Sequence, residues 1–275
     1  MSIAHEIQYQ MQVEHGKKEL PPALSMFSLE GKTAVITGAS NGLGKQIAMG
    51  YAMAGAQVML VARGEEKLKA LKEQLAGYDV EYCCADVSVS EDVQRMVKET
   101  IDRFGKIDIL VNNAGTTRRG PMIEYPDEEY DRIIAVNMRS CWLCQKYCGA
   151  EMLKRGKGGS IINIGSGAGH DGKKDSVPYG ASKGGMVMLS RGAAMEWALD
   201  GIRVNIVMPG TFKTDLFAKC IENDPHYVEK QMRRLPIGRF GEPAEIVGIC
   251  IYLACDNSAF MTGGIIYVDG GGNAQ

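Results

Sequence analysis

After residue 30 the chain alternates between strand-like and helix-like segments, and this alternation restricts the possible folds strongly. Several of the strand-like segments are apolar throughout, which is typical of strands buried on both faces of a parallel sheet. Because helical patterns separate them, the sequence predicts one α/β domain with a doubly wound, seven-stranded parallel sheet. The expected strands are KTAVIT, AQVMLVA, VEYCCA, IDILVNN, GSIINI, RVNIVM and GIIYV.

The sequence divides into an N-terminal extension, residues 1–28, and the α/β domain, residues 29–275. Ile3, Ile7 and Met11 have the spacing of one helical stripe, and Pro21 and Pro22 interrupt the chain after it. Two alternatives stay open for the extension. It is either a mobile tail or an arm packed on the body or on a neighbouring subunit.

Charge and hydropathy exclude several partners. The formal net charge of −2 gives no field that would attract nucleic acid or a membrane surface. No apolar run reaches the ~18 residues of a membrane span, and the N-terminus is too charged for a secretory signal. We therefore expect a cytoplasmic protein.

The eight cysteines are not expected to form disulfides in a cytoplasmic chain of this length. Cys141, Cys144 and Cys148 share one stripe of an expected helix, and no fourth metal ligand is evident nearby. We interpret them as small apolar residues on a packed face and predict no metal site. Cys83 and Cys84, on opposite faces of a strand, have the same interpretation.

The segment TGASNGLG, from Thr37 to Gly44, directly follows the first expected strand and opens a helix. Glycines let the backbone approach a pyrophosphate, and a helix N-terminus offers free N–H groups and a positive dipole end. The spacing of Gly38, Gly42 and Gly44 differs from the usual GxGxxG. Its position between strand and helix nevertheless predicts a dinucleotide site.

Four further motifs accompany this glycine segment. They are NNAG at Asn112–Gly115, Tyr179-xxx-Lys183, Ser166 before the tyrosine, and the Pro209-Gly210 pair after the sixth strand. Together they closely resemble the short-chain dehydrogenase/reductase family over nearly the whole chain outside the extension. The resemblance implies a Rossmann-type, NAD(P)-dependent oxidoreductase that interconverts a secondary alcohol and a ketone and assembles as a homotetramer.

Tyr179 and Lys183 lie one helical turn apart on one face. A nearby cation favours the phenolate, so we expect the tyrosine pKa to fall below its ordinary value of ~10. The resemblance implies that Tyr179 is the general acid/base, that Lys183 binds the nicotinamide ribose and relays protons, that Ser166 binds the substrate oxygen, and that Asn137 holds a water. This intact set disfavours a cofactor-binding regulator without catalysis.

The resemblance also implies a set of cofactor contacts. They are Gly38, Ser40, Asn41, Gly42, Leu43 and Gly44 at the phosphates and adenosine ribose, Asp86 and Val87 at the adenine, Asn113 and Gly115 under the cofactor, Tyr179 and Lys183 beside the nicotinamide, and Phe212 and Thr214 at its carboxamide.

Cofactor choice depends on the end of the second strand. Ala62 and Arg63 offer no carboxylate to repel a 2′-phosphate, and the guanidinium could pair with one. NADP(H) is therefore favoured, with NAD(H) possible. Asn41 argues against this preference, because many NADP-preferring relatives have a second basic residue there.

The segment NNAGTTRRGPMIEYPDEEYDRIIAVN resembles the gluconate 5-dehydrogenase and deoxygluconate dehydrogenase branch, chiefly through Arg118, Arg119 and Pro121. This implies a sugar acid or polyol as substrate, with Arg119 on a carboxylate and Ser166 and Tyr179 on the reacting oxygen. Alternatively, the arginines are solvated or lie at a subunit contact. The second candidate function is a hydroxysteroid dehydrogenase. The expected lid, residues 212–236, does not discriminate between them.

Overall fold

The computed structural model describes residues 25–223 and 226–274. Within these residues, parallel strands form one seven-stranded sheet in the order β3-β2-β1-β4-β5-β6-β7, which confirms the predicted fold class. The strands are β1 (Thr33–Thr37), β2 (Gln57–Ala62), β3 (Val80–Cys84), β4 (Ile109–Asn112), β5 (Gly159–Ile164), β6 (Ile202–Pro209) and β7 (Ile265–Val268).

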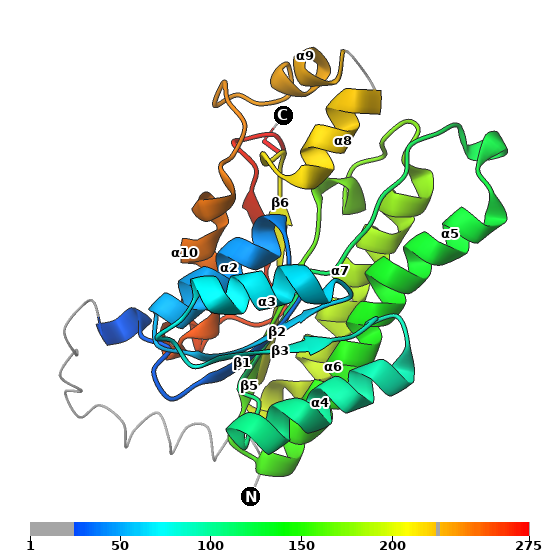
Figure 1. Cartoon of the computed structure of the whole chain (residues 1–275). Helices are drawn as coiled ribbons and strands as arrows, with labels where there is room; N and C mark the ends of the chain where they lie inside the picture. Colours follow the sequence, from blue (N-terminus) through cyan, green and yellow to red (C-terminus); the bar gives the residue numbers. More distant parts are fainter. Residues whose placement is uncertain (1–24, 224–225, 275) are drawn as a thin grey trace, which may run out of the picture.

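Helices cover both faces of the sheet (Figure 1). The longer helices are α2 (Gly42–Met53), α3 (Glu65–Gln74), α4 (Ser90–Phe104), α5 (Asp127–Ile134), α6 (Ser140–Arg155), α7 (Val177–Trp197), α8 (Asp215–Asn223), α9 (Tyr227–Met232) and α10 (Val247–Ala254). Short 3₁₀ turns are η1 (Ser25–Phe27), η2 (Met122–Glu124), η4 (Gly167–Gly169), η5 (Ala198–Asp200), η6 (Pro243–Ile246) and η7 (Asp256–Ser258).

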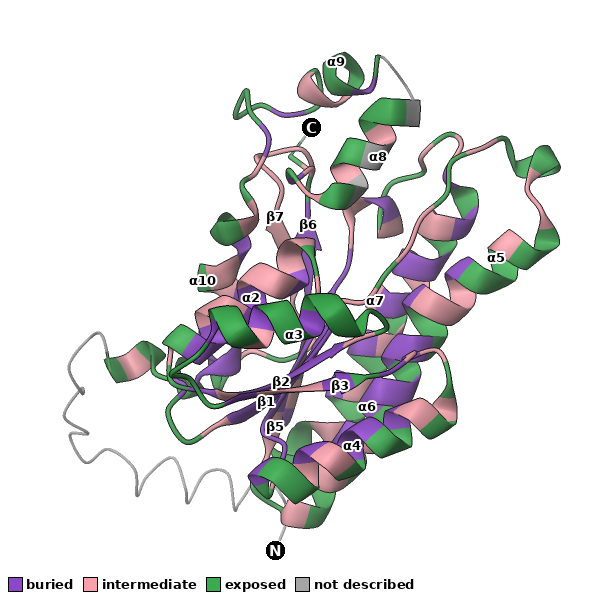
Figure 2. Cartoon of the chain, in the orientation of Figure 1, coloured by how far each residue is buried: buried purple, intermediate pink, exposed green. Residues whose placement is uncertain are grey.

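The sheet is buried from both sides, as Figure 2 shows by the purple strands between the helices. Ala34 and Ile36 of β1 pack in the core formed with α2, α3 and α10, whereas Val35 packs in the core formed with α4, α6 and α7. Successive residues of a strand face opposite sides. A strand covered on both sides must therefore be apolar throughout, which explains the apolar runs in the sequence.

The strand order reverses next to β1. Ile36 of β1 pairs with Leu60 of β2 on one side and with Val111 of β4 on the other. In open α/β sheets, ligands bind beyond the carboxyl ends of the strands at such a switch point. The segments that follow β1 and β4 are the glycine segment and NNAG, so the topology brings the two motifs to one crevice.

Between α5 and α6 the backbone forms a π-helical turn, η3 (Ala135–Arg139). The sequence predicted a helix over residues 137–156 and gave no indication of this turn. Asn137 lies at its centre and is fully buried. π-Turns inside helices frequently occur at functional sites.

The described end of the N-terminal extension packs on the body. The Asn257 side-chain amide donates a hydrogen bond to the Met26 carbonyl oxygen over 2.6 Å, and the Phe27 ring lies 6.4 Å from the Tyr252 ring, centroid to centroid. The predicted stripe of Ile3, Ile7 and Met11 lies outside the described residues.

The cysteines on α6 are packed as predicted, because Cys141, Cys144 and Cys148 are all buried. Cys83 is buried as predicted, whereas Cys84 is exposed, so the prediction of a packed position is wrong for Cys84. Among the described helices, none combines the length and the apolar character needed to cross a membrane.

Candidate active site

The glycine segment after β1 is held against NNAG by Asn113. The Asn113 side-chain amide donates to the carbonyl oxygens of Thr37 and Gly38, each over 3.1 Å. A Cβ atom at Gly44 would come within 2.3 Å of the Asn113 amide nitrogen, so this position has no room for a side chain. Gly38 adopts φ +66°, a conformation that favours glycine. The two predicted motifs thus form one packed unit.

The shape of this unit fits a dinucleotide. No side chain caps the N-terminus of α2, so its first N–H groups stay available to a phosphate. A Cβ atom at Gly115 would lie 3.5 Å from the Asn137 Oδ1 atom and 3.8 Å from the Lys183 Nζ atom. Glycine therefore leaves this space free for the cofactor. Thr214, expected at the carboxamide, lies opposite the phosphate loop, since a Cβ atom at Gly42 would be 3.3 Å from its methyl group.

Phe212, the other residue expected at the carboxamide, is buried and pairs as an isolated parallel bridge with Gly241. The ring fills the space beside that glycine, because a Cβ atom at Gly241 would come within 2.7 Å of it. The Phe212 ring is thus packed inward, and its backbone is the part available to a ligand.

The ends of β2 and β3 lie next to each other at the expected adenosine end. The exposed Arg63 guanidinium lies 3.9 Å from the Asp86 carboxylate, whose Oδ1 atom accepts hydrogen bonds from Ser88. Val87 is buried beside them.

Lys67, in the first turn and a half of α3, was missed by sequence reasoning. Its Nζ atom donates a hydrogen bond to the Asn41 side-chain oxygen over 3.1 Å. Its signal in the sequence was its position one helical turn after Arg63. The structure therefore brings a second cation to the position where Asn41 appeared to lack one.

The four residues predicted for catalysis come together. Ser166 lies two residues after β5 and is the N-cap of η4. It forms a side-chain hydrogen bond with Tyr179 of α7. The Lys183 Nζ atom lies 5.9 Å from the Tyr179 ring centroid and donates to the Ile164 carbonyl oxygen over 2.8 Å. Asn137 of η3 donates to Ser182, the residue before that lysine, over 2.9 Å.

The two titrating groups have shifted pKa values. Burial raises the pKa of Tyr179, and the hydrogen bond from Ser166 acts in the opposite direction. Burial also lowers the pKa of Lys183 to about 8. The expected lowering of the tyrosine pKa by this lysine is therefore wrong for the protein by itself, because desolvation outweighs an ammonium group that is turned to a backbone carbonyl.

The Asn137 side chain joins two parts of the site. Its Oδ1 atom accepts from the Thr116 backbone N–H over 2.7 Å, and its amide donates to the Thr116 carbonyl oxygen over 2.9 Å and to Ser182. Both amide hydrogens are thus used within the protein. These contacts fix the segment after β4 against α7, which is a positioning role. A water at Asn137, as expected from the sequence, therefore cannot accept a hydrogen bond from the side-chain amide.

The segment predicted as a lid carries α8 and α9. Figure 1 shows α8 and α9 beyond the carboxyl end of β6. The Arg119 guanidinium lies over the Tyr227 ring of α9, 5.1 Å from its centroid. Burial, together with the neighbouring Cys220 and Tyr179, raises the pKa of Tyr227 to about 12, and the Arg119 guanidinium acts in the opposite direction. Arg119 and Tyr179 are therefore both neighbours of Tyr227.

Arg118 takes a different direction. Its guanidinium lies 5.8 Å from the Tyr125 ring centroid, and the Tyr125 hydroxyl donates to the Arg118 carbonyl oxygen. Of the two adjacent arginines, Arg119 is the one that reaches the lid.

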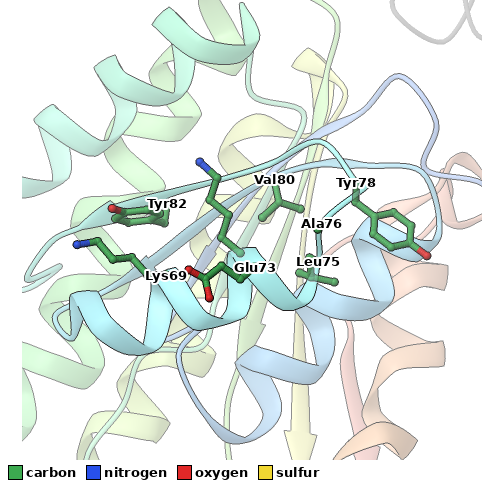
Figure 3. Close-up of a pocket in the computed structure, with 8 residues that line it drawn as sticks. Lys69, Glu73, Leu75, Ala76, Tyr78, Val80 and Tyr82 are labelled. Atoms are coloured by element: carbon green, nitrogen blue, oxygen red, sulfur yellow. The ribbon is translucent and has the colours of Figure 1, made fainter.

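A shallow depression of about 380 Å³ lies elsewhere, between α3 and the edge strand β3 (Figure 3). Lys69, Glu73, Tyr78 and Tyr82 are among its lining residues. None of the predicted site residues lines it, so it is separate from the crevice described above.

The chain matches the family model described as Enoyl-(Acyl carrier protein) reductase over residues 38–273. It is 35% identical over 248 residues to 5-keto-D-gluconate 5-reductase of Escherichia coli K12, covering 90% of this chain and 97% of that protein.

Two solved structures are similar. A short-chain type dehydrogenase/reductase from Mycobacterium marinum has a TM-score of 0.87 at 36% identity, covering 92% of this chain and 99% of the other. A gluconate 5-dehydrogenase from Burkholderia cenocepacia, in complex with NADP and tartrate, has a TM-score of 0.86 at 34% identity, covering 92% and 100%. With the sheet order, the glycine segment and the Ser166–Tyr179–Lys183 arrangement, these matches place the chain in the short-chain dehydrogenase/reductase family of NAD(P)-dependent oxidoreductases.

Proposed function

We propose that the protein interconverts a secondary alcohol and a ketone on a sugar acid or polyol, as a gluconate 5-dehydrogenase does. The observation that carries this proposal is Arg119, which comes from the segment after NNAG and lies over Tyr227 next to Tyr179. A guanidinium that shares Tyr227 as a neighbour with Tyr179 is suited to a substrate carboxylate. The similarity to the reductase of 5-keto-D-gluconate supports the same substrate class.

The proposed chemistry assigns a role to each side chain. Tyr179 is protonated at neutral pH, because burial raises its pKa, so it can donate its proton to a ketone oxygen during reduction. Ser166 holds the same oxygen, and Lys183 supplies the replacement proton. In the oxidative direction Tyr179 first passes its proton to neutral Lys183, and the resulting phenolate accepts the hydroxyl proton. When bound, the nicotinamide supplies or takes up the hydride.

A substrate panel tests the function. Sugar acids, polyols and steroids are assayed with both nicotinamide cofactors. Turnover of a sugar acid supports the proposal. Turnover of steroids without any sugar acid would make a hydroxysteroid dehydrogenase the better assignment, and binding of cofactor without hydride transfer would indicate a regulator.

Arg119→Ala is expected to raise the KM for a sugar acid roughly 10- to 100-fold, because a charge-assisted contact is lost. Cofactor affinity should not change, since Arg119 lies on the lid side of the site. Arg118→Ala is the matched control, because Arg118 contacts Tyr125 instead. Equal KM values for the two variants would remove Arg119 from substrate binding.

We also propose that NADP(H) is the preferred cofactor. Arg63 and Lys67 are the cations that would receive the 2′-phosphate, with Asn41 joining Lys67 to the phosphate loop. Asp86 lies 3.9 Å from Arg63 and orients it. The similar gluconate 5-dehydrogenase was crystallised with NADP, which supports this preference.

Arg63→Ala and Lys67→Gln are each expected to weaken NADP⁺ binding, Arg63→Ala by roughly 10- to 100-fold, while NAD⁺ binding changes little. Isothermal titration calorimetry measures both affinities without turnover. Lys69→Gln is the control, because Lys69 is paired with Glu65 on the same helix. A wild-type protein that binds NAD(H) far more tightly than NADP(H) would contradict this proposal.

The assembly is proposed to be a homotetramer with α6 and α7 at subunit contacts. Met188, Met195 and Leu199 form one exposed stripe along α7 and η5, and Trp142 of α6 is also exposed. We expect light scattering at micromolar concentration to give the mass of four chains, and Met195→Asp to reduce it. A wild-type monomer would refute the assignment.

A further inference from the structure

Three cations from separate segments gather beside the candidate substrate space. Arg119 follows β4, Lys173 lies in the polar segment after β5, and Arg234 follows α9. Lys173 is half-buried, and its Nζ atom would be 3.9 Å from a Cβ atom at Gly167, the neighbour of Ser166. Burial lowers the pKa of Lys173, and the charges of Arg234 and Arg119 lower it further. This lysine is therefore close to the reacting centre and among like charges.

Lys173 has no hydrogen bond or ion pair with any residue that the structure describes. Two acids lie near enough to affect it, Asp171 and Asp269. Asp171 pairs with the His170 ring nitrogen over 2.9 Å. Both oxygens of Asp269 accept backbone N–H groups, from Gly271 and Asn273. The acids thus have other partners, whereas the ammonium group has none among the described residues.

A backbone hydrogen bond holds the segments that carry Arg119 and Lys173 next to each other. The Gly120 N–H donates to the Asp175 carbonyl oxygen over 3.0 Å, which links the segment after β4 to the segment after β5. Asp175 has φ +60°. Among the described residues it is the only non-glycine residue with a positive φ. Such a conformation persists only where its surroundings enforce it, and it is found preferentially at binding sites.

Like charges on a partly desolvated site are unfavourable until an anion neutralises them. The ligand chemistry that fits is a carboxylate on the substrate, since Lys173 lies beside the neighbour of Ser166 and Arg119 lies over Tyr227. The anion would then be attached to the same small molecule as the reacting hydroxyl.

We propose that Lys173 is a specificity-determining residue that binds the substrate carboxylate together with Arg119. This inference rests on the proposed sugar-acid function and adds the residue that selects acids over neutral polyols. Arg234 adds long-range attraction from the lid segment. Lys174, the next residue, is exposed and has no such position.

The experiment compares D-gluconate with D-glucitol, its neutral polyol counterpart, in wild type, Lys173→Gln, Lys173→Arg and Lys174→Gln. For Lys173→Gln we expect KM for gluconate, or its Ki where it only inhibits, to rise roughly 10- to 100-fold. The constants for glucitol and the Kd for NADP⁺ should stay within about twofold. Lys173→Arg should recover most of the gluconate affinity, and Lys174→Gln should resemble wild type.

The outcomes distinguish a failure of the role proposed for Lys173 from a failure of the proposed sugar-acid function. Suppose that wild type oxidises gluconate and that Lys173→Gln either leaves the KM for gluconate unchanged or weakens the binding of gluconate and glucitol equally. The role of Lys173 is then refuted and the proposed function stands. If wild type turns over no sugar acid but gluconate inhibits competitively through Lys173, the function fails and the anion site stands. A wild type that neither oxidises gluconate nor is inhibited by it overturns both.

Discussion

Tyr179→Phe should give a protein that still binds NADP(H) but turns over substrate roughly 10²–10⁴ times more slowly, the usual contribution of a positioned general acid or base. The substitution keeps the ring and its packing on α7 and removes the hydroxyl that bonds to Ser166. Cofactor affinity depends on the glycine segment and Lys183, which are unchanged. Steady-state turnover and fluorescence titration of NADPH measure the two quantities.

Tyr147→Phe provides the control for this substitution, because the Tyr147 hydroxyl is bonded to Ser90 on the α4 side of the molecule. It should lose little activity. Near-normal turnover in Tyr179→Phe would show that another group moves the proton, and the assignment of the general acid would have to be withdrawn.

Lys183→Met is expected to lower both cofactor affinity and turnover. The Nζ atom is buried, and its loss leaves the Ile164 carbonyl oxygen without its donor. An unsatisfied buried acceptor costs about 1–3 kcal/mol, so the melting temperature must be measured alongside activity. A variant that remains folded yet has lost cofactor affinity would separate the functional loss from the structural one.

The dependence of the reduction rate on pH can distinguish a proton-relay role of Lys183 from a purely structural role, because a structural role would not change that dependence. Burial lowers the pKa of Lys183 to about 8, so the ammonium form is present below that pH and is lost above it. If this lysine supplies the replacement proton, ketone reduction by wild type should slow as the pH rises through about 8. Lys183→Met should lack this step. Profiles of identical shape would exclude Lys183 from the proton relay.

The sheet could be predicted because each strand is buried on both faces and therefore reads as an apolar run. The phosphate loop and NNAG could be placed together because both follow parallel strands that end at one edge. The contact of Asn113 with Thr37 and Gly38 is what this placement requires.

Other parts of the site have no local pattern. Lys67, Lys173 and Tyr227 are separated from their partners by long stretches of chain, and only the tertiary fold brings them to Asn41, Gly167 and Arg119. The prediction of a lowered Tyr179 pKa was wrong for a related reason. Residue spacing shows that Lys183 is one turn away, but the extent of burial, which dominates the shift, depends on everything packed around Tyr179.

The π-turn at η3 makes chain length, in addition to the side chain of Asn137, a quantity that this region must conserve. α5, η3 and α6 run end to end, and the turn contains one residue more than an α-helical turn would. Each helical residue rotates the chain by about 100°. Deleting one residue here would therefore rotate α6 and turn Cys144, Cys148 and Met152 away from the sheet. Point substitutions leave that rotation intact, so, apart from Asn137, variation among homologues should be found in the residues of this turn and not in their number.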